Sequence, residues 1–288
     1  MNKCTNNTAR LLITCDDKSG IVQAVSSFLY HQGANITALD QYATAPTGGR
    51  YFMRVEFELD QLSSRKETLQ QTFATNVAER YDMQWRFAFV GDVKKVGILV
   101  SKVDHALLEL LWRHARGSLP CEITHVVSNH PDLRESVENF GIPFTVIPVN
   151  KDNKVEAYRQ MNELLKDNDL LVLARYMQIL NEEFVDQWDT KIINIHHSFL
   201  PAFVGANPYQ QAYDKGVKLI GATAHYVTAE LDQGPIIEQD VERVSHNFTV
   251  EELRELGEDV ERNVLARAVK WHLEDRIIVD GNKTVVFQ

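Results

Sequence analysis

The sequence predicts an α/β protein with two domains: an N-terminal ferredoxin-like βαββαβ domain, followed by a Rossmann-like domain with a mostly parallel sheet. Stretches with strand-like and helix-like apolar spacing follow each other in the order βαββαβ up to Val90. From Val96 onward single strands and helices alternate, which is typical of parallel strands joined by helical crossovers. Charge supports the division, because residues 1–90 hold nine basic and nine acidic residues, so the net charge of −10 lies entirely in 91–288.

The first domain is expected to begin with a strand and an amphipathic helix, in which apolar residues between Ile21 and Leu29 recur at helical spacing. Gly33 ends that helix, and a turn containing Pro46 and Gly48 separates the next two strands. A polar connector follows the last strand, so we expect the domains to comprise residues 1–90 and 91–288. The expected strands are 10–15, 36–42, 51–59 and 84–90, and the expected helices are 21–32 and 61–80.

The second domain contains short aliphatic runs, such as 170–173, that have the length of buried parallel strands. Each run is followed by a stretch with helical spacing, and a long helix with two short strands around Ile277 and Val285 completes the chain. In such sheets, reacting groups gather where strands end. The expected strands are 96–100, 122–127, 144–147, 170–173 and 192–195, and the expected helices are 106–116, 132–140, 154–166, 181–188 and 250–272.

Composition excludes several classes of function. With 44% hydrophobic residues the chain resembles an ordinary globular protein, and its net charge of −10 argues against general nucleic-acid binding, which needs a basic face. The aliphatic runs are strand-sized and the N-terminus lacks an apolar segment, so we expect no membrane association and a cytoplasmic location. Cys4, Cys15 and Cys121 are too few and too scattered for a disulfide framework, which favours idle thiols in a reducing compartment.

Polar residues at the end of one predicted strand carry the candidate chemistry. Asn194 and His196 are two residues apart, so in an extended strand both side chains project from the same face. Asp232 lies in a Leu-Asp-Gln-Gly-Pro turn that follows another strand. An amide donor, an imidazole and a carboxylate together suit acyl-group chemistry, in which a carbonyl oxygen gains negative charge. The residues alone leave open that Asn194 and His196 simply end a strand and that Asp232 simply forms a turn.

Two other chemistries are disfavoured. Nine of the ten histidines lie in the second domain, but no pair has helical i, i+4 spacing with an accompanying carboxylate, and His196 and His197 would point apart in a strand. We therefore expect no metal. No Gly-x-Ser-x-Gly sequence occurs, and Ser198 and the cysteines have no evident activating partner, which disfavours a nucleophilic side chain.

The run from Asn194 to Phe203, Asn-Ile-His-x-Ser-x-Leu-Pro-x-Phe, with the Asp-x-Gly at Asp232 to Gly234, resembles the folate-dependent formyltransferases. The resemblance implies that Asn194, His196 and Asp232 are catalytic. It also implies that no cofactor is needed, because the formylated folate is itself the substrate.

The same resemblance implies a folate pocket, since the family holds the pteridine against the loop after strand 170–173 and against the loop before Asp232. His225 would supply a supporting hydrogen bond. His197, where the transferases often have Pro, is expected to point to the opposite face and to support the site from behind or face solvent. Gln178 stands where the ribonucleotide transferase has Arg. The implied substrate-binding residues are Tyr176, Met177, Gln178, Ile179, Leu180, His225 and Gly234, with a core role open for part of the apolar ones.

The first domain carries a second resemblance. The turn Asp17-Lys-Ser-Gly20-Ile21 and the stretch Gly33-x-Asn35-Ile36 resemble an ACT domain. This implies that a small amino acid such as glycine or methionine binds as an effector, and that sheets pair between subunits in a homo-oligomer, a dimer or a tetramer. A plain helix-start turn, in which the glycine serves only geometry, stays open as the alternative. The implied effector-binding residues are Asp17, Gly20, Ile21 and Asn35.

The first turn of the second domain separates transfer from hydrolysis. The transferase that formylates a ribonucleotide has a glycine-rich turn there, through which backbone N–H groups approach the phosphate. Here the turn is Ser101-Lys-Val-Asp-His105, without glycine, and Asp104 would repel a phosphate. We therefore expect hydrolysis of 10-formyltetrahydrofolate to formate and tetrahydrofolate, with water as acceptor, in one-carbon and purine metabolism. Formyl transfer to an amine such as glycinamide ribonucleotide, and a non-catalytic sensor, are the alternatives.

Overall fold

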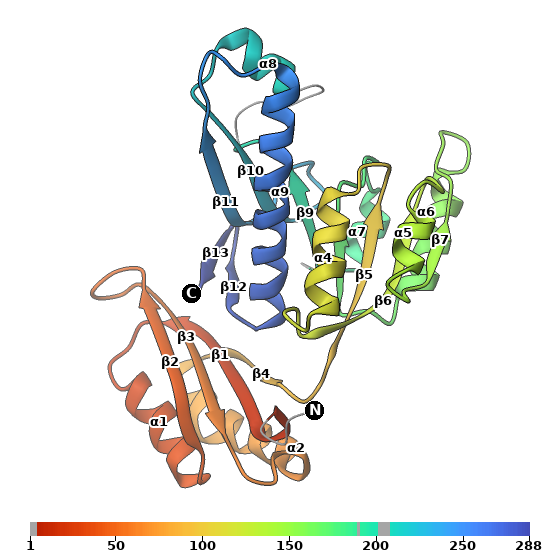
Figure 1. Ribbon diagram of the computed structural model, residues 1–288. Coiled ribbons are helices and arrows are strands. Elements are labelled where there is room, and N and C mark those ends of the chain that lie inside the picture. The colour runs from red at the N-terminus through yellow and green to blue at the C-terminus, as the bar shows by residue number, and fades with distance from the viewer. Residues whose placement is uncertain (1–4, 189–190, 201–207) are drawn as a thin grey trace. The chain divides into compact units, whose positions relative to one another are not determined.

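The computed structural model describes residues 5–188, 191–200 and 208–288, which form two compact units (Figure 1). The first unit runs up to Val93 and also contains the tail segments Asp275–Ile278 and Val285–Gln288. The second unit comprises Lys94–Glu274 and Val279–Thr284. Residues 201–203, the end of the motif that begins at Asn194, lie outside the described residues. Within the described ranges, no helix combines the length and the apolar character needed to cross a membrane.

The first unit is a four-stranded antiparallel sheet in the order β2-β3-β1-β4, with helices on one face (Figure 1). Its core lies between these layers, where Leu11 and Val55 of the sheet pack with Phe28 and Phe73 of the helices. The helix expected over 61–80 contains a π-helical turn at Ala74–Ala78. The elements are η1 (Thr5–Asn7), β1 (Thr8–Asp16), α1 (Ile21–His31), β2 (Asn35–Ala43), β3 (Arg50–Glu58), α2 (Leu62–Phe73), α3 (Glu79–Tyr81) and β4 (Gln84–Phe89).

The tail completes the first unit. Asp275 pairs with Arg10 and Arg86, at 3.4 and 2.8 Å, and Phe287 packs with Leu12 of β1. Two short strands, β12 (Ile277–Asp280) and β13 (Lys283–Val286), pair with each other. A segment from the far end of the sequence therefore contributes charged and apolar contacts to the first unit.

The second unit contains a seven-stranded sheet among its described residues, in the order β11-β10-β9-β8-β5-β6-β7 (Figure 1). The five strands from β9 to β7 in this order are parallel, whereas β10 and β11 are antiparallel to their neighbours. The predicted fold class is confirmed, although β11 was not among the expected strands. The strands are β5 (Lys94–Val100), β6 (Cys121–Ser128), β7 (Phe144–Val146), β8 (Leu170–Leu173), β9 (Ile192–His196), β10 (Leu219–Tyr226) and β11 (Ile236–Arg243).

Helices pack on this sheet, and the longest, α9, contacts β9, β10, β11 and α4. It begins at a capping box, in which the side chain of Thr249 accepts from the backbone of Glu252 and the Glu252 side chain accepts in return. The short helix α8 was not expected, and α5 and α7 are shorter than expected. The helices are α4 (His105–Ala115), α5 (Arg134–Glu138), α6 (Lys154–Leu165), α7 (Glu182–Asp186), α8 (Pro208–Lys215) and α9 (Val250–Leu273).

Candidate active site

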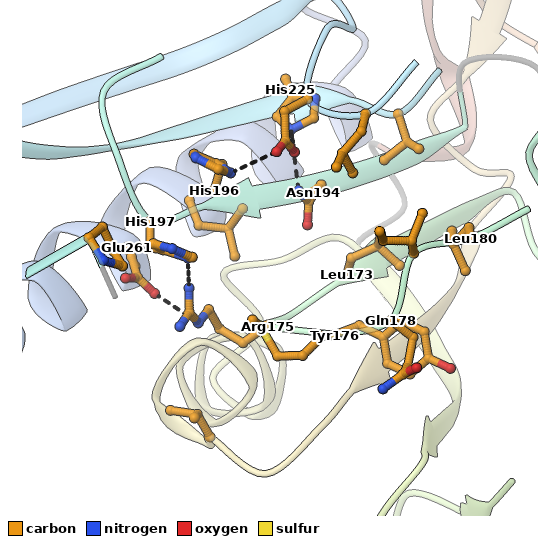
Figure 2. Close-up of a pocket in the computed structure, with 18 of the residues that line it drawn as sticks. Leu173, Arg175, Tyr176, Gln178, Leu180, Asn194, His196, His197, His225 and Glu261 are labelled. Atoms are coloured by element: carbon orange, nitrogen blue, oxygen red, sulfur yellow. Dashed lines mark hydrogen bonds and ion pairs between the residues drawn. The ribbon is translucent and has the colours of Figure 1, made fainter. Parts of the chain in front are cut away.

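A cavity of about 900 Å³ lies in the second unit where the parallel strands β8 and β9 end (Figure 2). This volume is at the upper end of the range for small-molecule sites. One side of the cavity is mostly apolar and is lined by the segments 176–180 and 227–231. The other side is polar and includes Arg175, His197 and Glu261. The apolar wall of the cavity therefore suits a flat apolar ligand, and the polar wall suits a polar reacting group.

Asn194, His196 and Asp232 converge in this cavity. The Nδ1 atom of His196 lies 3.3 Å from Oδ2 of Asp232. His225 lies between the acid and the amide: its Nε2 atom is 3.6 Å from Oδ1 of Asp232 and 3.2 Å from Nδ2 of Asn194 (Figure 2). All four side chains line the cavity. The structure therefore brings together the amide, the imidazole and the carboxylate, which come from separate segments of the sequence.

The pairing of β9 with β10 explains why these residues meet. The antiparallel register puts His225 directly opposite Asn194. The turn after β10 carries Asp232, whose backbone lies in the left-handed region with φ 56°. Gly234 lets this turn close, because a Cβ atom there would lie 1.8 Å from the carbonyl oxygen of Tyr226. Gly234 does not line the cavity, so its contribution is to the backbone that carries Asp232.

Asp232 is held as a carboxylate. Hydrogen bonds from His196 and then from His225 lower the pKa of Asp232 well below its ordinary value, and they outweigh burial, which acts in the opposite direction. Only 16% of the Asp232 side chain is exposed, so solvent screens these interactions weakly. The carboxylate therefore places a fixed negative charge beside the His196 ring.

His225 orients the amide of Asn194. Its Nδ1 atom is 2.9 Å from the carbonyl oxygen of Tyr226, and since a carbonyl only accepts, Nδ1 carries the proton. Its Nε2 atom faces the amide nitrogen of Asn194 at 3.2 Å and the carboxylate of Asp232 at 3.6 Å. An amide N–H group suits Asn194 for stabilising negative charge on a carbonyl oxygen in the cavity.

The loop after β8 is anchored at two points. The hydroxyl of Tyr158 donates to the carbonyl oxygen of Ile179 at 2.7 Å, and the backbone N–H of Met177 donates to Oγ of Ser101 at 2.9 Å. These contacts fix the backbone that presents the segment 176–180 to the cavity.

The side chains of this loop divide between cavity and core. Met177 and Ile179 are 57% and 59% exposed while lining the cavity. Tyr176 and Leu180 also line it, but they pack at the same time against the core cluster of the sheet and α6. Gln178 lines the cavity as well. All five residues of this loop that were expected to contact a folate therefore line the cavity. Of the three for which a core role was the alternative, Leu180 packs against the core, whereas Met177 and Ile179 are exposed.

The sequence pattern predicted that the His197 side chain points away from the site, but in the structure it does not. Its ring stacks on that of His196, with centroids 5.0 Å apart and an angle of 13° between the planes, and it lines the cavity. The expectation of the opposite face fails because β9 ends at His196, so the alternation of a strand does not extend to the next residue. The structure also gives His197 a hydrogen-bond partner, Arg175.

Glu261, on α9, was not assigned by the sequence analysis. Its carboxylate is 1% exposed and accepts from Nε2 of His105 and from the hydroxyl of Tyr209, each at 2.8 Å. The signal that could have found it is an acid within the buried stripe of the helix, next to Val260 and three residues before Val264. An acid in such a stripe indicates a paired or functional group.

The turn 101–105 contains no glycine that would let backbone N–H groups surround a phosphate. The hydroxyl of Ser101 donates to Asn129 at 2.7 Å, and His105 is paired with Glu261. Val103 lines the cavity, and Asp104 immediately precedes α4.

Among the residues that the structure describes, no group of three or more His, Cys, Asp or Glu is placed to hold a metal ion.

The first unit has a cavity of its own, of about 590 Å³, at the start of α1. Asp17, Gly20 and Ile21 line it, together with Tyr42 of β2. Gly20 adopts a left-handed conformation with φ 95° directly before the helix, which explains the glycine. Asn35, the fourth expected effector residue, is exposed at the start of β2 and does not line this cavity.

Comparison with known proteins identifies the family of the chain. Residues 94–269 match the family model described as formyl transferase, and residues 9–74 match that of the ACT domain. A formyltetrahydrofolate deformylase from Bacillus subtilis is 55% identical over 96% of this chain and 93% of its own. A crystal structure of a formyltetrahydrofolate deformylase from Pseudomonas syringae superposes with a TM-score of 0.93, at 46% identity over 98% of this chain and 94% of that one.

A transferase is a more distant match. The crystal structure of glycinamide ribonucleotide transformylase 1 from Symbiobacterium toebii gives a TM-score of 0.65 at 28% identity, covering 69% of this chain and 96% of that one. The transferase thus matches only part of this chain, whereas the deformylases match nearly all of it. The chain belongs to the formyltetrahydrofolate deformylase family, with an ACT domain followed by a formyl transferase domain.

Proposed function

We propose that this chain hydrolyses 10-formyltetrahydrofolate to formate and tetrahydrofolate, with water as the formyl acceptor. The observation that carries the proposal is the convergence of Asn194, His196 and Asp232 in one cavity, in a chain that matches deformylases over 96% of its length. Residues 91–288 are the catalytic part, and residues 1–90 serve regulation or assembly.

The three side chains divide the work of the reaction. Water adds to the formyl carbon, and negative charge develops on the formyl oxygen, where the amide N–H of Asn194 and the protonated ring of His196 stabilise it. Asp232, held as a carboxylate, orients the water and supports the charge on the imidazole. The C–N bond then breaks, the folate nitrogen takes one proton of the water, the second proton leaves to solvent, and formate departs.

The apolar wall would hold the folate. Met177 and Ile179 offer apolar surface on one side, and residues 227–231 face them from the turn that carries Asp232. A flat heteroaromatic ring between these two segments would bring its formyl group toward Asn194 and His196 (Figure 2). Gln178 is a candidate for a hydrogen bond to the polar edge of the ring.

Water is the acceptor that this cavity favours. The turn 101–105, which faces the site through Val103, has no glycine and carries Asp104, so it does not favour a phosphate-bearing amine.

Formate release tests the proposal. Purified protein is incubated with 10-formyltetrahydrofolate and no amine, and formate is measured through formate dehydrogenase. We expect equimolar formate and tetrahydrofolate, and the same rate when glycinamide ribonucleotide is added. Turnover that requires the amine would instead establish a transferase, and folate binding without any turnover would establish a sensor.

In the first unit, we propose that a small amino acid, glycine or methionine, binds the cavity at Asp17, Gly20 and Ile21 and changes the rate. The N-terminus of α1 faces this cavity, and its backbone N–H groups together with Asp17 suit a ligand that carries both a carboxylate and an ammonium group. Glycine and methionine are titrated separately into the formate assay, with Asp17→Asn as the variant. A rate that neither amino acid alters would remove this part of the proposal.

The edge strand β2 of the first unit is mostly exposed, and we propose that it pairs with a second copy in a homo-oligomer of even number. Light scattering at several protein concentrations tests this. A mass equal to that of one chain at micromolar concentration would contradict it.

A further inference from the structure

Arg175 adopts a conformation that few residues with a side chain adopt. Its backbone φ is 63°, in the left-handed region, and Asp232 is the other residue of the cavity wall that shares this property. Such a conformation persists only where the surroundings hold it. The surroundings of Arg175 are specific, because its guanidinium contacts both Glu261 and His197 (Figure 2).

Glu261 forms an ion pair with the arginine and is itself held by two other side chains. The Nε atom of Arg175 lies 3.4 Å from Oε2 of Glu261, whose carboxylate also accepts from His105 of α4 and Tyr209 of α8. Burial disfavours the charged form of Glu261, but the hydrogen bond from His105 and the charge of Arg175 outweigh it, so the pKa of Glu261 is lowered. A buried carboxylate that accepts hydrogen bonds from α4 and α8 therefore forms an ion pair with the guanidinium.

The contact with Arg175 determines the protonation of His197. A guanidinium has only donors, so Nδ1 of His197 must accept and therefore carries no proton. The neutral ring then has its proton on Nε2, which is buried and has no hydrogen-bond partner among the described residues. Burial, followed by the positive charge of Arg175, lowers the pKa of His197 to about 4.

The neutral ring of His197 lies against the ring that the reaction uses. The His196 and His197 planes are nearly parallel and their centroids are 5.0 Å apart. Two cationic rings at this distance would repel each other, so a proton on His197 would oppose a proton on His196. The charged and titratable groups that face His197 are Arg175 from the loop after β8, Glu261 from α9, His196 from its own strand and Asp232 from the turn after β10.

We propose, on the basis of the hydrolysis proposed above, that Arg175 is a positioning residue for His196. Anchored by Glu261, its guanidinium holds His197 as a neutral imidazole stacked on the His196 ring, so that only His196 of the two takes up a proton during turnover. Arg175 and Glu261 act through His197 and need not touch the folate.

The protonation state of the His197 ring in the resting protein tests this proposal directly. Two-dimensional NMR of protein labelled with ¹⁵N at histidine is recorded between pH 5.5 and 8.5, with His197→Phe used to assign the signals. We expect a pyridine-type Nδ1 and a pyrrole-type Nε2 for His197, without titration in this range. A pyrrole-type Nδ1, or a ring that becomes doubly protonated, overturns the inference, and neither result requires a variant enzyme to be active.

Arg175→Met tests the coupling. Without the guanidinium, and with the titration extended down to pH 4, His197 is expected to titrate about one pH unit higher than in the wild type, toward the ordinary histidine value of about 6.5 but still below it, because burial persists. The substitution alters the position and charge of the histidine rings but not the apolar wall proposed to hold the folate. We therefore expect kcat for formate release to fall by up to about 10²-fold, while KM changes by less than about threefold. The matched control is Arg254→Met, which removes an exposed arginine of the same cavity wall and should leave the His197 signals unchanged.

A double-mutant cycle separates this role from a direct effect on the substrate. Phenylalanine at position 197 is a neutral ring that cannot titrate, so in the His197→Phe background Arg175→Met should lower kcat by less than about threefold further. Fully additive losses would overturn the inference. Absence of formate release from the wild-type protein would remove the proposed hydrolysis, whereas the NMR result on His197 would stand or fall by itself.

Discussion

Replacing Asp232 by asparagine is expected to remove most turnover while leaving folate affinity largely intact. The asparagine side chain has nearly the same shape, so the turn after β10 is retained, but its amide carries no charge. The His196 ring then loses the negative charge beside it, and the attacking water loses its acceptor.

The magnitude follows from the contact between Asp232 and His196. A full charge pair at 3.3 Å interacts by about 5 kcal/mol at an effective dielectric constant of about 20. This value is an upper limit, because desolvation opposes it, and at about 1.36 kcal/mol per tenfold it corresponds to a rate loss of at most about 10³- to 10⁴-fold. We therefore expect kcat to fall by about 10³-fold.

The assay measures formate release and, separately, the affinity for tetrahydrofolate by titration calorimetry. The affinity should change by less than about threefold, because the substitution leaves the loop 176–180, proposed to hold the folate, unaltered. Asp240→Asn is the matched control: this acid on β11 pairs with Arg267 at 2.6 Å, is 46% exposed and does not line the cavity. Its kcat should stay near that of the wild type.

Two results would refute this reasoning. If Asp232→Asn retained near-normal kcat, the carboxylate would not take part in the reaction. If it lost folate affinity as strongly as it lost rate, Asp232 would act in binding rather than in stabilising the transition state.

Three further outcomes are expected. Asn194→Ala should lower kcat by about 10²- to 10³-fold, as loss of an oxyanion donor does, with tetrahydrofolate affinity in calorimetry unchanged; an unchanged rate would exclude the amide from catalysis. Gly234→Ala should lower both the urea midpoint and the rate, because the new Cβ would meet the carbonyl oxygen of Tyr226 at 1.8 Å, and a wild-type midpoint would contradict this. Hydrogen bonds from two histidines depress the pKa of Asp232, so its contribution to stability is complete above the ordinary carboxyl pKa and is lost as pH falls through the depressed pKa. The difference in Tm between the wild type and Asp232→Asn should therefore shrink below about pH 4. A difference in Tm that stays constant would contradict this.

Local pattern predicted the elements that carry the site. Asn194 and His196 are two residues apart in an apolar run, so a strand puts both on one face, and the structure has them on the last residues of β9. The alternation of strands and helices predicted the parallel sheet whose ends form the cavity. The helix α9 was likewise predicted from spacing, within one residue of its observed end.

Local sequence patterns do not show which residues of neighbouring strands lie opposite each other, or where a strand ends. The register of β10 on β9 brings His225 opposite Asn194, and the turn that follows carries Asp232. The position of these residues at strand ends suggested that they could meet, but the pattern did not give the register that brings them together. His197 was misjudged because the strand stops one residue earlier.

The amino-acid sequence by itself determined the fold class, most strands and helices, and which residue types could perform acyl chemistry, because these depend on periodicity and side-chain chemistry over a few positions. Tertiary structure alone decided that Glu261 anchors Arg175 against His197, and that the tail joins the first unit. The physical reason is that burial and pairing of a charge depend on residues that are distant in sequence, and those partners exist only once the chain has packed.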